Sequence, residues 1–365
     1  MAAQQEYLSF TFAPHVLEDL GVNLYTSVAK ALVEFVANAH DADAQWVNVS
    51  FDADAVKLAR DTLKAQHEFN KAKAKKEGTT FVEPLAEQIL GDDIQIIIQD
   101  NGVGMSREDL ESKFLVIGRR RRRGMAMNAR TDGGRIIMGC KGLGKLAGFG
   151  IAHVIEVTSK VATEAHATRI TLDLDTLLNS GHPPEEGNQA DDPAKQARVQ
   201  VPVITLPDGG GLEKGTRIVL KSLVYDAVRG ELSQSLTQAL AENFYGIKTE
   251  DFAIKINDAP VDTTGAEFAH AFPKNGEVAK TDLVQATLPS ADLFGSPVSF
   301  EYRIRFRLPK NQLPAKARGM RVYAHNRLAS VPDLLDVKSS AHGFQYTSYL
   351  DGVVVADFID EQPTD

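Results

Sequence analysis

Three polar side chains in the sequence are spaced as if on one face of a helix. The stretch over 26–43, TSVAKALVEFVANAHDAD, contains no Gly or Pro, and Glu34, Asn38 and Asp41 stand at positions i, i+4 and i+7 within it. At 100° per residue they fall within about 60° of one another. A carboxylate that activates water beside an amide oxygen that binds a hard cation such as Mg²⁺ would use this arrangement. A solvated polar stripe has the same pattern, so the spacing alone leaves both interpretations open.

A carboxylate and two glycines follow an isoleucine-rich strand expected over 93–99. The motif is Asp100-x-Gly102-x-Gly104. A carboxylate at a strand end can accept a hydrogen bond from an exocyclic amine such as that of adenine, and glycines let the backbone approach a flat ring closely. A simple turn after a strand is the alternative interpretation.

A second glycine-rich segment, GCKGLGK over 139–145, precedes the expected helical stretch LAGFGIA. Glycines before a helix present free N–H groups to phosphate oxygens. The segment nearly matches the P-loop pattern GxxxxGK[ST], but Leu146 stands where the Ser or Thr is required. The P-loop interpretation is therefore disfavoured. Further along, GTRIVL over 215–220 reads as a strand on which the Thr216 hydroxyl can support the carboxylate of Asp100.

The remaining pattern predicts an alternation of helices and strands. We expect helix over the first forty residues, and Ser106 and Asp109 form the capping box of another helix. The lysine run that ends the second long helix is expected to be a solvated face. The main domain boundary is placed near 222–230. The other expected elements are strands over 45–51, 153–161, 166–174, 199–206 and 215–220, helices over 56–77 and 228–243, and a loop over 179–195.

In their order and spacing, the four segments resemble the GHKL ATPase superfamily of DNA gyrase B, heat-shock chaperones, histidine kinases and MutL-type mismatch-repair proteins. EFVANAHDADA is similar to the family's N-box, DNGVGM to its first glycine box, GCKGLGK to its second, and GTRIVL to its closing strand. The resemblance covers about residues 10–222. It implies an α+β fold class, with a Bergerat-type α/β-sandwich ATPase domain over 1–222, a lid over about 105–138, and binding of ATP and Mg²⁺.

The resemblance also implies roles for single residues. Glu34 would be the general base, Asn38 the magnesium ligand and Asp41 a residue of the nucleotide pocket. Asp100 would bind the adenine amine with Thr216 behind it. The other implied contacts are Gly102, Gly104 and Met105 at the adenine, and Gly139, Lys141, Gly142, Leu143, Gly144 and Lys145 at the phosphates, where Lys145 would also be catalytic.

Five consecutive arginines, Arg119, Arg120, Arg121, Arg122 and Arg123, lie in the expected lid. Many relatives carry Ser, Thr and Lys there, so the run is a departure from the family pattern. Three interpretations stay open: contact with phosphate or a partner chain when the lid closes, contact with DNA, and a solvated loop.

The chain beyond 222 suggests a subfamily. GMRVYAHNRL over 319–328 reads as a strand pair around a tight turn and is similar to a stretch of the microrchidia (MORC) ATPases and their prokaryotic relatives. This likeness implies a ribosomal-protein-S5-like α/β transducer domain over 223–365. Relatives commonly supply a basic residue from this domain to the γ-phosphate. No basic residue falls at the matching position (Lys316, Arg318, Arg327 and Lys338 do not), so we expect an amino-terminal portion of a longer protein or an unusual member.

Composition narrows the setting. The chain has 365 residues, a net charge of −9 and a pI near 5.6, which argues against a general nucleic-acid coat. A single cysteine excludes a disulfide scaffold, and a reducing, cytoplasmic setting is expected. No apolar run approaches the ~20 residues that span a bilayer, so no membrane partner is expected. Two main functions remain: an ATP-gated homodimeric clamp that acts on DNA, and a chaperone-like remodeler of protein clients. A nucleotide-binding switch with negligible turnover is a third, weaker alternative.

Overall fold

The chain folds into two compact units, which are described separately. A computed structural model describes residues 6–12, 28–81, 83–116, 130–135, 137–138, 144–180, 197–230, 232–244, 247–263, 268–274, 279–280, 282–289, 296–309, 312–313, 315–324, 327–335 and 344–361. Unit 1 comprises Met1–Leu240 and Thr249–Val261, and unit 2 comprises Ala241–Lys248 and Asp262–Asp365. None of the described helices is long and apolar enough to span a membrane.

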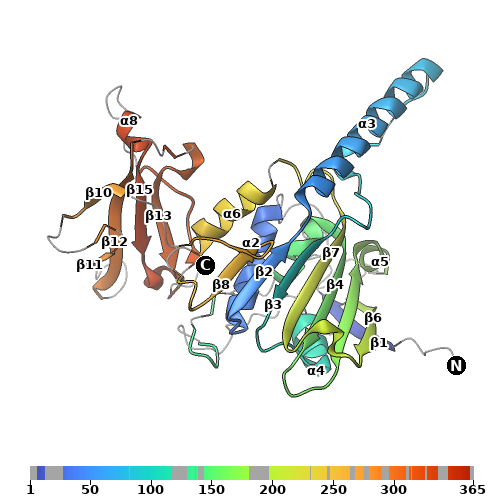
Figure 1. The fold of residues 1–365 in the computed structure, drawn as a ribbon, viewed down its shortest axis with the longest axis horizontal. Coiled ribbons are helices and arrows are strands. Elements are labelled where there is room, and N and C mark those ends of the chain that lie inside the picture. Colours follow the sequence, from blue (N-terminus) through green and yellow to red (C-terminus); the bar gives the residue numbers. More distant parts are fainter. Residues whose placement is uncertain are drawn as a thin grey trace, which may run out of the picture. The chain divides into compact units, whose positions relative to one another are not determined.

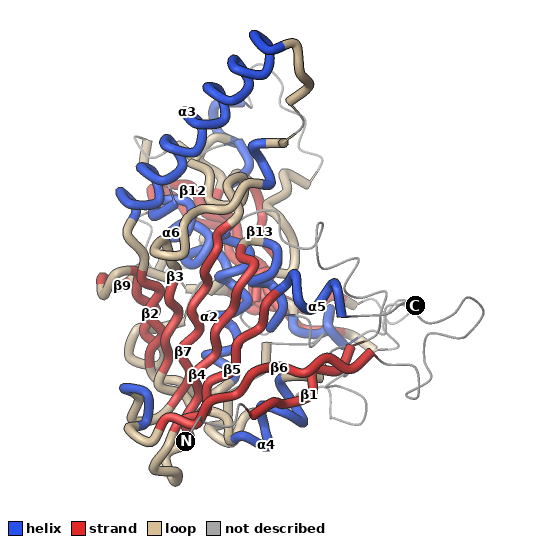
Figure 2. The backbone as a smooth tube through the Cα atoms, turned by 90° about the vertical axis from the view of Figure 1, so that its right-hand side faces the viewer, coloured by secondary structure: helices blue, strands red, loops and turns tan. Residues whose placement is uncertain are grey.

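Unit 1 is built on one nine-stranded sheet with the order β1-β6-β5-β4-β7-β3-β2-β8-β9 (Figures 1 and 2). All its neighbouring strands are antiparallel except β2 and β8, which are parallel. The strands are β1 (Glu6–Phe12), β2 (Trp46–Ser50), β3 (Ile96–Asp100), β4 (Ala152–Lys160), β5 (Ala167–Asp173), β6 (Ala197–Leu206), β7 (Gly215–Leu223), β8 (Ala253–Ile256) and β9 (Ala259–Pro260).

Helix α2 (Val28–Asp41) supplies much of the core of this unit. Nine of its 14 residues are buried, among them Leu32 and Val36. One of these buried residues, Phe35, lies against Gly148 of the 3₁₀ helix η3 (Gly144–Gly150). The other helical segments of this part of the chain are α3 (Ala53–Glu77), η1 (Leu85–Glu87), α4 (Arg107–Asp109), the π-helical η2 (Leu110–Phe114), α5 (Leu174–Ser180), η5 (Gly209–Gly211) and α6 (Leu232–Asn243).

Local chemistry explains where two of these helices begin. Asp52 accepts a hydrogen bond from the backbone N–H of Ala55 at the start of α3, and Gly78 ends that helix in the left-handed conformation. At α4, Ser106 and Asp109 form the capping box that the sequence predicts.

The expectation of helix over the first forty residues is wrong for Glu6–Phe12, which is strand β1. Leu8 and Phe10 are buried, whereas Tyr7 and Ser9 are exposed, and the segment pairs with β6 from Glu6↔Val203 to Phe12↔Ala197. Burial that alternates with period two is typical of a strand. The partner strand lies almost 200 residues away, and pairing with it overrides the local helix propensity.

Unit 1 extends to Leu240 and also includes Thr249–Val261, whereas the sequence predicts a domain boundary near 222. The physical reason is the pairing of β8 with β2, in which Trp46 lies opposite Ala253. This pairing adds residues 249–261 to the first sheet. The sequence gives no local sign of it, because a parallel pairing needs a distant partner.

Unit 2 contains a second sheet with the order β10-β12-β15-β13-β14, and β11 pairs with β12. Strands β13 and β14 form the pair that the sequence predicts over 319–328, and β13 also pairs in parallel with β15. The elements are β10 (Phe268–Phe272), β11 (Val284–Leu288), β12 (Val298–Arg307), η6 (Ala315–Ala317), β13 (Gly319–Ala324), β14 (Arg327–Leu328), α8 (Phe344–Thr347), β15 (Asp351–Val355) and η7 (Asp357–Glu361).

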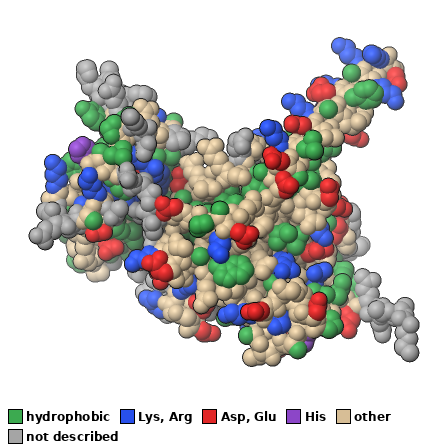
Figure 3. Space-filling model, viewed as in Figure 1, with side chains coloured by type: hydrophobic (Ala, Val, Ile, Leu, Met, Phe, Trp, Pro, Cys, Tyr) green, Lys and Arg blue, Asp and Glu red, His purple; other side chains and the backbone are tan. Residues whose placement is uncertain are grey.

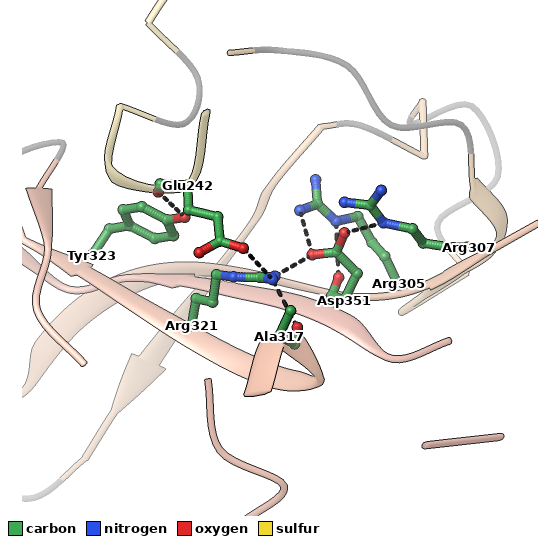
Figure 4. Close-up of polar contacts among 7 residues, drawn as sticks. All are labelled: Glu242, Arg305, Arg307, Ala317, Arg321, Tyr323 and Asp351. Carbon is green, nitrogen blue, oxygen red and sulfur yellow. Dashed lines mark hydrogen bonds and ion pairs between the residues drawn. The ribbon is translucent and has the colours of Figure 1, made fainter. Parts of the chain in front are cut away.

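Buried charge is a feature of the core of unit 2 (Figure 4). Asp351 is buried, with 4% of its surface exposed. Its carboxylate oxygens lie 2.6 Å from Nη1 of Arg321, 2.7 Å from Nε of Arg307 and 3.8 Å from Nη2 of Arg305. Arg321 also lies 3.7 Å from a carboxylate oxygen of Glu242. Glu242, Arg307, Arg321 and Asp351 border a hollow of about 80 Å³. The network ties β12, β13 and β15 together through one carboxylate.

Candidate nucleotide-binding site

The polar residues of α2 form one stripe on an otherwise buried helix. Only Ala29, Lys30, Glu34, Asn38 and Asp41 are not buried, and the last four lie within about 80° of one another. A merely solvated helix would expose a broad polar face. Here the three residues predicted to act on nucleotide share one narrow face of α2, on which Glu34 and Asn38 are half-buried and the Asp41 side chain is 4% exposed.

Asp41 connects the end of α2 to the segment before the second glycine box. Its Oδ1 accepts a hydrogen bond of 2.8 Å from the backbone N–H of Met138, and the Nδ1 of His40 lies 3.5 Å from the same oxygen. The carboxylate therefore holds residue 138, which comes directly before the predicted phosphate-binding glycines, against the stripe.

Asp100 is half-buried at the end of β3. Its Oδ1 accepts hydrogen bonds from the backbone N–H groups of Gly102 at 2.8 Å and Thr216 at 3.3 Å. Burial raises the pKa of Asp100 to about 6, and the two backbone hydrogen bonds lower it again in part. Because these donors are neutral N–H groups, the carboxylate is suited to accept a further hydrogen bond from a neutral N–H donor.

Thr216 lies beside Asp100 as predicted, but its hydroxyl bonds to a residue that the sequence does not reveal. The Oγ atoms of Ser159 and Thr216 are 2.8 Å apart, and Ser159 also accepts a hydrogen bond of 2.9 Å from the backbone N–H of Met105. Ser159 is opposite Thr216 in the β4–β7 pairing. Only that register brings it to the site, so no sequence motif could have found it.

Glycine is required at both positions of the first glycine box. A Cβ atom at Gly102 would lie 2.7 Å from the carbonyl oxygen of Ala42, and one at Gly104 would lie 2.0 Å from that of Lys160. Gly104 also has φ +72°, which L side chains rarely adopt. The backbone of the box thus lies flat against the end of α2 and the end of β4.

Two further residues missed by sequence reasoning fasten the end of the predicted lid to α2. Asp43 accepts hydrogen bonds from the Thr131 hydroxyl at 2.5 Å and from the Gly133 N–H at 2.9 Å. Arg135 donates to the carbonyl oxygens of Ala44 at 2.7 Å and Asp251 at 2.6 Å. Residues 130–135 are therefore held to the loop after α2.

Several predicted residues fall outside what the structure describes. They are Gly139, Lys141, Gly142, Leu143 and the arginine run Arg119–Arg123. Gly144 and Lys145 open the 3₁₀ helix η3, and the side chain of Lys145 lies outside the description. Among the described parts, the structure brings together Glu34, Asn38 and Asp41 on α2, and Asp100, Gly102, Gly104, Met105 and Thr216 around the end of β3.

The described donors suit magnesium bound mainly by phosphates. In the described ranges no group of three or more His, Cys, Asp or Glu side chains could hold a metal ion. Mg²⁺ takes hard oxygen ligands, keeps several waters and is commonly bound through one or two protein oxygens together with substrate phosphates. The half-exposed amide of Asn38 offers one such oxygen next to the Asp41 carboxylate.

Comparison with known proteins agrees with this geometry. Residues 25–186, somewhat less than half of the chain, match a family model described as "Histidine kinase-, DNA gyrase B-, and HSP90-like ATPase". The match spans α2, the first glycine box and β4–β5, and supports membership of this superfamily for that part. The fold class is accordingly α+β, with a GHKL-type ATPase domain.

The chain is also similar to a protein of Herpetosiphon aurantiacus described as "Putative type II restriction enzyme HgiDII". The two are 25% identical over 368 aligned positions, which cover 97% of this chain and 50% of the relative. The chain thus spans about half the length of that relative. A specific likeness to the microrchidia ATPases has no support in either match.

Proposed function

We propose that the chain binds and hydrolyses ATP with Mg²⁺, that ATP drives homodimerisation of its first unit, and that the dimer acts on DNA. The observation that carries the proposal is the placement of Glu34, Asn38 and Asp41 on one narrow face of α2, with the Asp41 carboxylate bonded to the Met138 N–H. The half-buried Asp100 carboxylate at the end of β3 adds a matching adenine contact. The ATPase-family match over residues 25–186 supports the same chemistry.

Each residue of the stripe has a distinct role in this proposal. The Glu34 carboxylate takes a proton from the attacking water. The Asn38 amide oxygen would hold the Mg²⁺ ion, which when bound would supply positive charge beside the phosphates. Asp41 keeps the backbone at Met138 in place, so that the following glycines can approach the phosphates. The chemical contribution is positioning together with charge stabilisation.

At the adenine end, the Asp100 carboxylate accepts a hydrogen bond from the exocyclic amine. The backbone N–H groups of Gly102 and Thr216 fix its orientation, and Ser159 connects Thr216 to Met105. GTP carries a carbonyl at the corresponding ring position, which would face the carboxylate and leave it without a donor. Such a mismatch costs about 1–3 kcal/mol, so we propose selectivity for ATP.

The DNA part of the proposal has two supports. The relative from Herpetosiphon aurantiacus is described as a restriction enzyme, a class that acts on DNA. The run Arg119–Arg123 supplies five positive charges within the predicted lid. The competing interpretation is remodelling of protein clients.

The test measures both mass and turnover. Light scattering should show a doubling of mass with a non-hydrolysable ATP analogue, and duplex DNA should stimulate hydrolysis more than an unfolded protein client does. Replacing Arg119–Arg123 with glutamine should reduce the salt slope of DNA binding by roughly one per lost phosphate contact. Stimulation by the unfolded client alone would favour the chaperone interpretation, and no hydrolysis under any condition would contradict the ATPase assignment.

The pKa of Asp100 predicts a pH effect on ATP affinity. As the pH falls below about 6, the carboxyl binds a proton and no longer accepts from the adenine amine. At pH 5 only about a tenth of the groups stay ionised, so the affinity for ATP should be about tenfold weaker than at pH 7.5. Isothermal titration measures the ATP affinity at each pH. Because the phosphates of ATP also titrate, the pH effect on wild-type affinity is compared with that on the Asp100→Asn variant. The variant should bind weakly at both pH values.

The same shift predicts the opposite slope for stability without nucleotide. The folded-state pKa of Asp100 lies above the ordinary aspartate value of 3.8, so between pH 4 and 6 the folded chain binds more protons than the unfolded chain. The contribution of this group to stability therefore rises as the pH falls through that window. A wild type and an Asp100→Asn variant with parallel pH profiles, in both binding and unfolding, would show that Asp100 does not titrate in the site.

A further inference from the structure

Helix α3 carries two apolar seams, and unit 1 covers only one of them. The covered seam consists of Leu63, His67, Asn70 and Ala74, all half-buried, with the His67 ring 5.1 Å from that of Phe81. The other seam lies about 150° around the helix. Its members are all exposed and follow the 4-3-4-3 spacing of a coiled coil: Leu58, Thr62, Ala65, Phe69 and Ala72.

The second seam is unusual for a helix that faces only water. Leu58 is 69% exposed and Phe69 is 65% exposed, and Val56 is the only buried residue of this 25-residue helix. Figure 1 shows α3 extending beyond the end of the unit 1 sheet, and Figure 3 shows apolar side chains among charged ones along it. A solvated helix would place polar residues at these five positions.

The distribution of charge on α3 indicates what covers the seam. The last two turns carry Lys71, Lys73, Lys75 and Lys76 against Glu77, and no ion pair is recorded for these lysines among the described residues. The first turn carries Asp52 and Asp54, both exposed. Two such helices side by side in parallel would set lysine against lysine. Antiparallel, Lys75 and Lys76 of each helix meet the end of the other that carries Asp52 and Asp54, where Lys57 also lies, and the helix dipoles oppose favourably.

We propose that α3 pairs with α3 of a second copy of this chain, antiparallel and centred on Ala65. In this register Lys75 and Lys76 of each copy lie opposite residues 55 and 54 of the other. Leu58 lies opposite Ala72 of the other copy, and Phe69 lies beside Thr62. Large residues thus face small ones, which lets the two helices approach closely. The pairing needs no nucleotide and is separate from the ATP-driven dimerisation proposed above.

A disulfide at the twofold axis tests the register. Cys140 is the only native cysteine, so Cys140→Ala leaves a background without thiols. In that background, Ala65→Cys should give a disulfide-linked dimer under mild oxidation without ATP. Ala72→Cys, an equally exposed alanine, should not link to itself, because its twin lies about 21 Å away along the helix. Mixed with Leu58→Cys, it should form a heterodimer.

Charge reversal tests the same pairing in solution. Lys75→Glu with Lys76→Glu should weaken nucleotide-free association about tenfold in sedimentation equilibrium, and adding Asp54→Lys should restore it. Circular dichroism checks that α3 stays helical. Equal linking of the Ala65→Cys and Ala72→Cys variants, linking of Ala72→Cys alone, or a monomer at all concentrations without ATP would each overturn the proposal. Loss of duplex DNA binding with unchanged association in the charge-reversal variant would assign the lysines to DNA instead.

Discussion

Glu34→Gln is expected to lower ATP turnover by about 10²–10⁴-fold, the usual contribution of a positioned general base. The amide keeps the size of the side chain but cannot take the proton from water. ATP affinity should stay within about twofold, because the proposed contacts to adenine and phosphates come from Asp100 and the glycine segments rather than from Glu34. Single-turnover hydrolysis measures the chemical step, and equilibrium titration with a fluorescent ATP analogue measures binding.

A matched control is Glu87→Gln, at an exposed glutamate in η1 whose side chain contacts no other polar group in the described part of the chain. It should leave turnover and binding at wild-type values. The Glu34→Gln variant should also accumulate the ATP-bound dimer, since hydrolysis is the step proposed to reset it. Turnover at the wild-type rate in Glu34→Gln would remove Glu34 from the role of base, and a matching loss of affinity would indicate a structural defect in α2.

The sequence predicts the parts of the site that lie on single elements. Glu34, Asn38 and Asp41 share one helix face because helical spacing alone decides it, and the structure leaves Glu34 and Asn38 half-buried on that face. Asp100 and its glycines follow one strand directly, so the turn and its close backbone approach are local as well. Each of these features depends on a few consecutive residues.

What the sequence misses depends on pairing between distant segments. Ser159 reaches Thr216 only through the β4–β7 register, and Arg135 reaches the carbonyl oxygen of Asp251 only because β8 joins the first sheet. The sequence predicts helix where strand β1 lies for the same reason. A strand register fixes contacts across more than 50 residues, and period-two alternation over seven residues is too short to reveal it.

The arginines of unit 2 show a further limit of pattern reading. On β12, Arg303 and Arg305 alternate with half-buried residues, as polar residues on a solvated face would do, yet they are 2% and 0% exposed. Their burial is compatible with folding only if carboxylates and carbonyl oxygens meet them. For Arg305, Asp351 supplies a carboxylate and a carbonyl oxygen from 46 residues further along the chain. Its carboxylate lies 3.8 Å from Nη2 of Arg305, and its backbone oxygen accepts a hydrogen bond of 3.2 Å from Nε of Arg305.

Asp351→Asn is therefore expected to destabilise unit 2 by about 3–5 kcal/mol, the cost of removing one partner from a buried ion pair. The substitution keeps the size of the side chain but removes the negative charge that Arg305, Arg307 and Arg321 share. Hydrogen–deuterium exchange with mass spectrometry localises the effect. Peptides from β12, β13 and β15 should exchange faster by the corresponding factor, while peptides from β3 and β4 in unit 1 should not change.

The matched control is Glu301→Gln, which also removes a carboxylate charge from unit 2. Glu301 lies on β12, is exposed and has no recorded side-chain contact, so its loss should change stability by no more than about 0.5 kcal/mol. Lys at position 351 should be worse than Asn, since a fourth cation would join the three arginines. Hydrogen–deuterium exchange in β12 and β15 could instead be equally slow in Asp351→Asn and Glu301→Gln. That result would mean that Glu242 and backbone oxygens alone compensate the charge of the buried arginines.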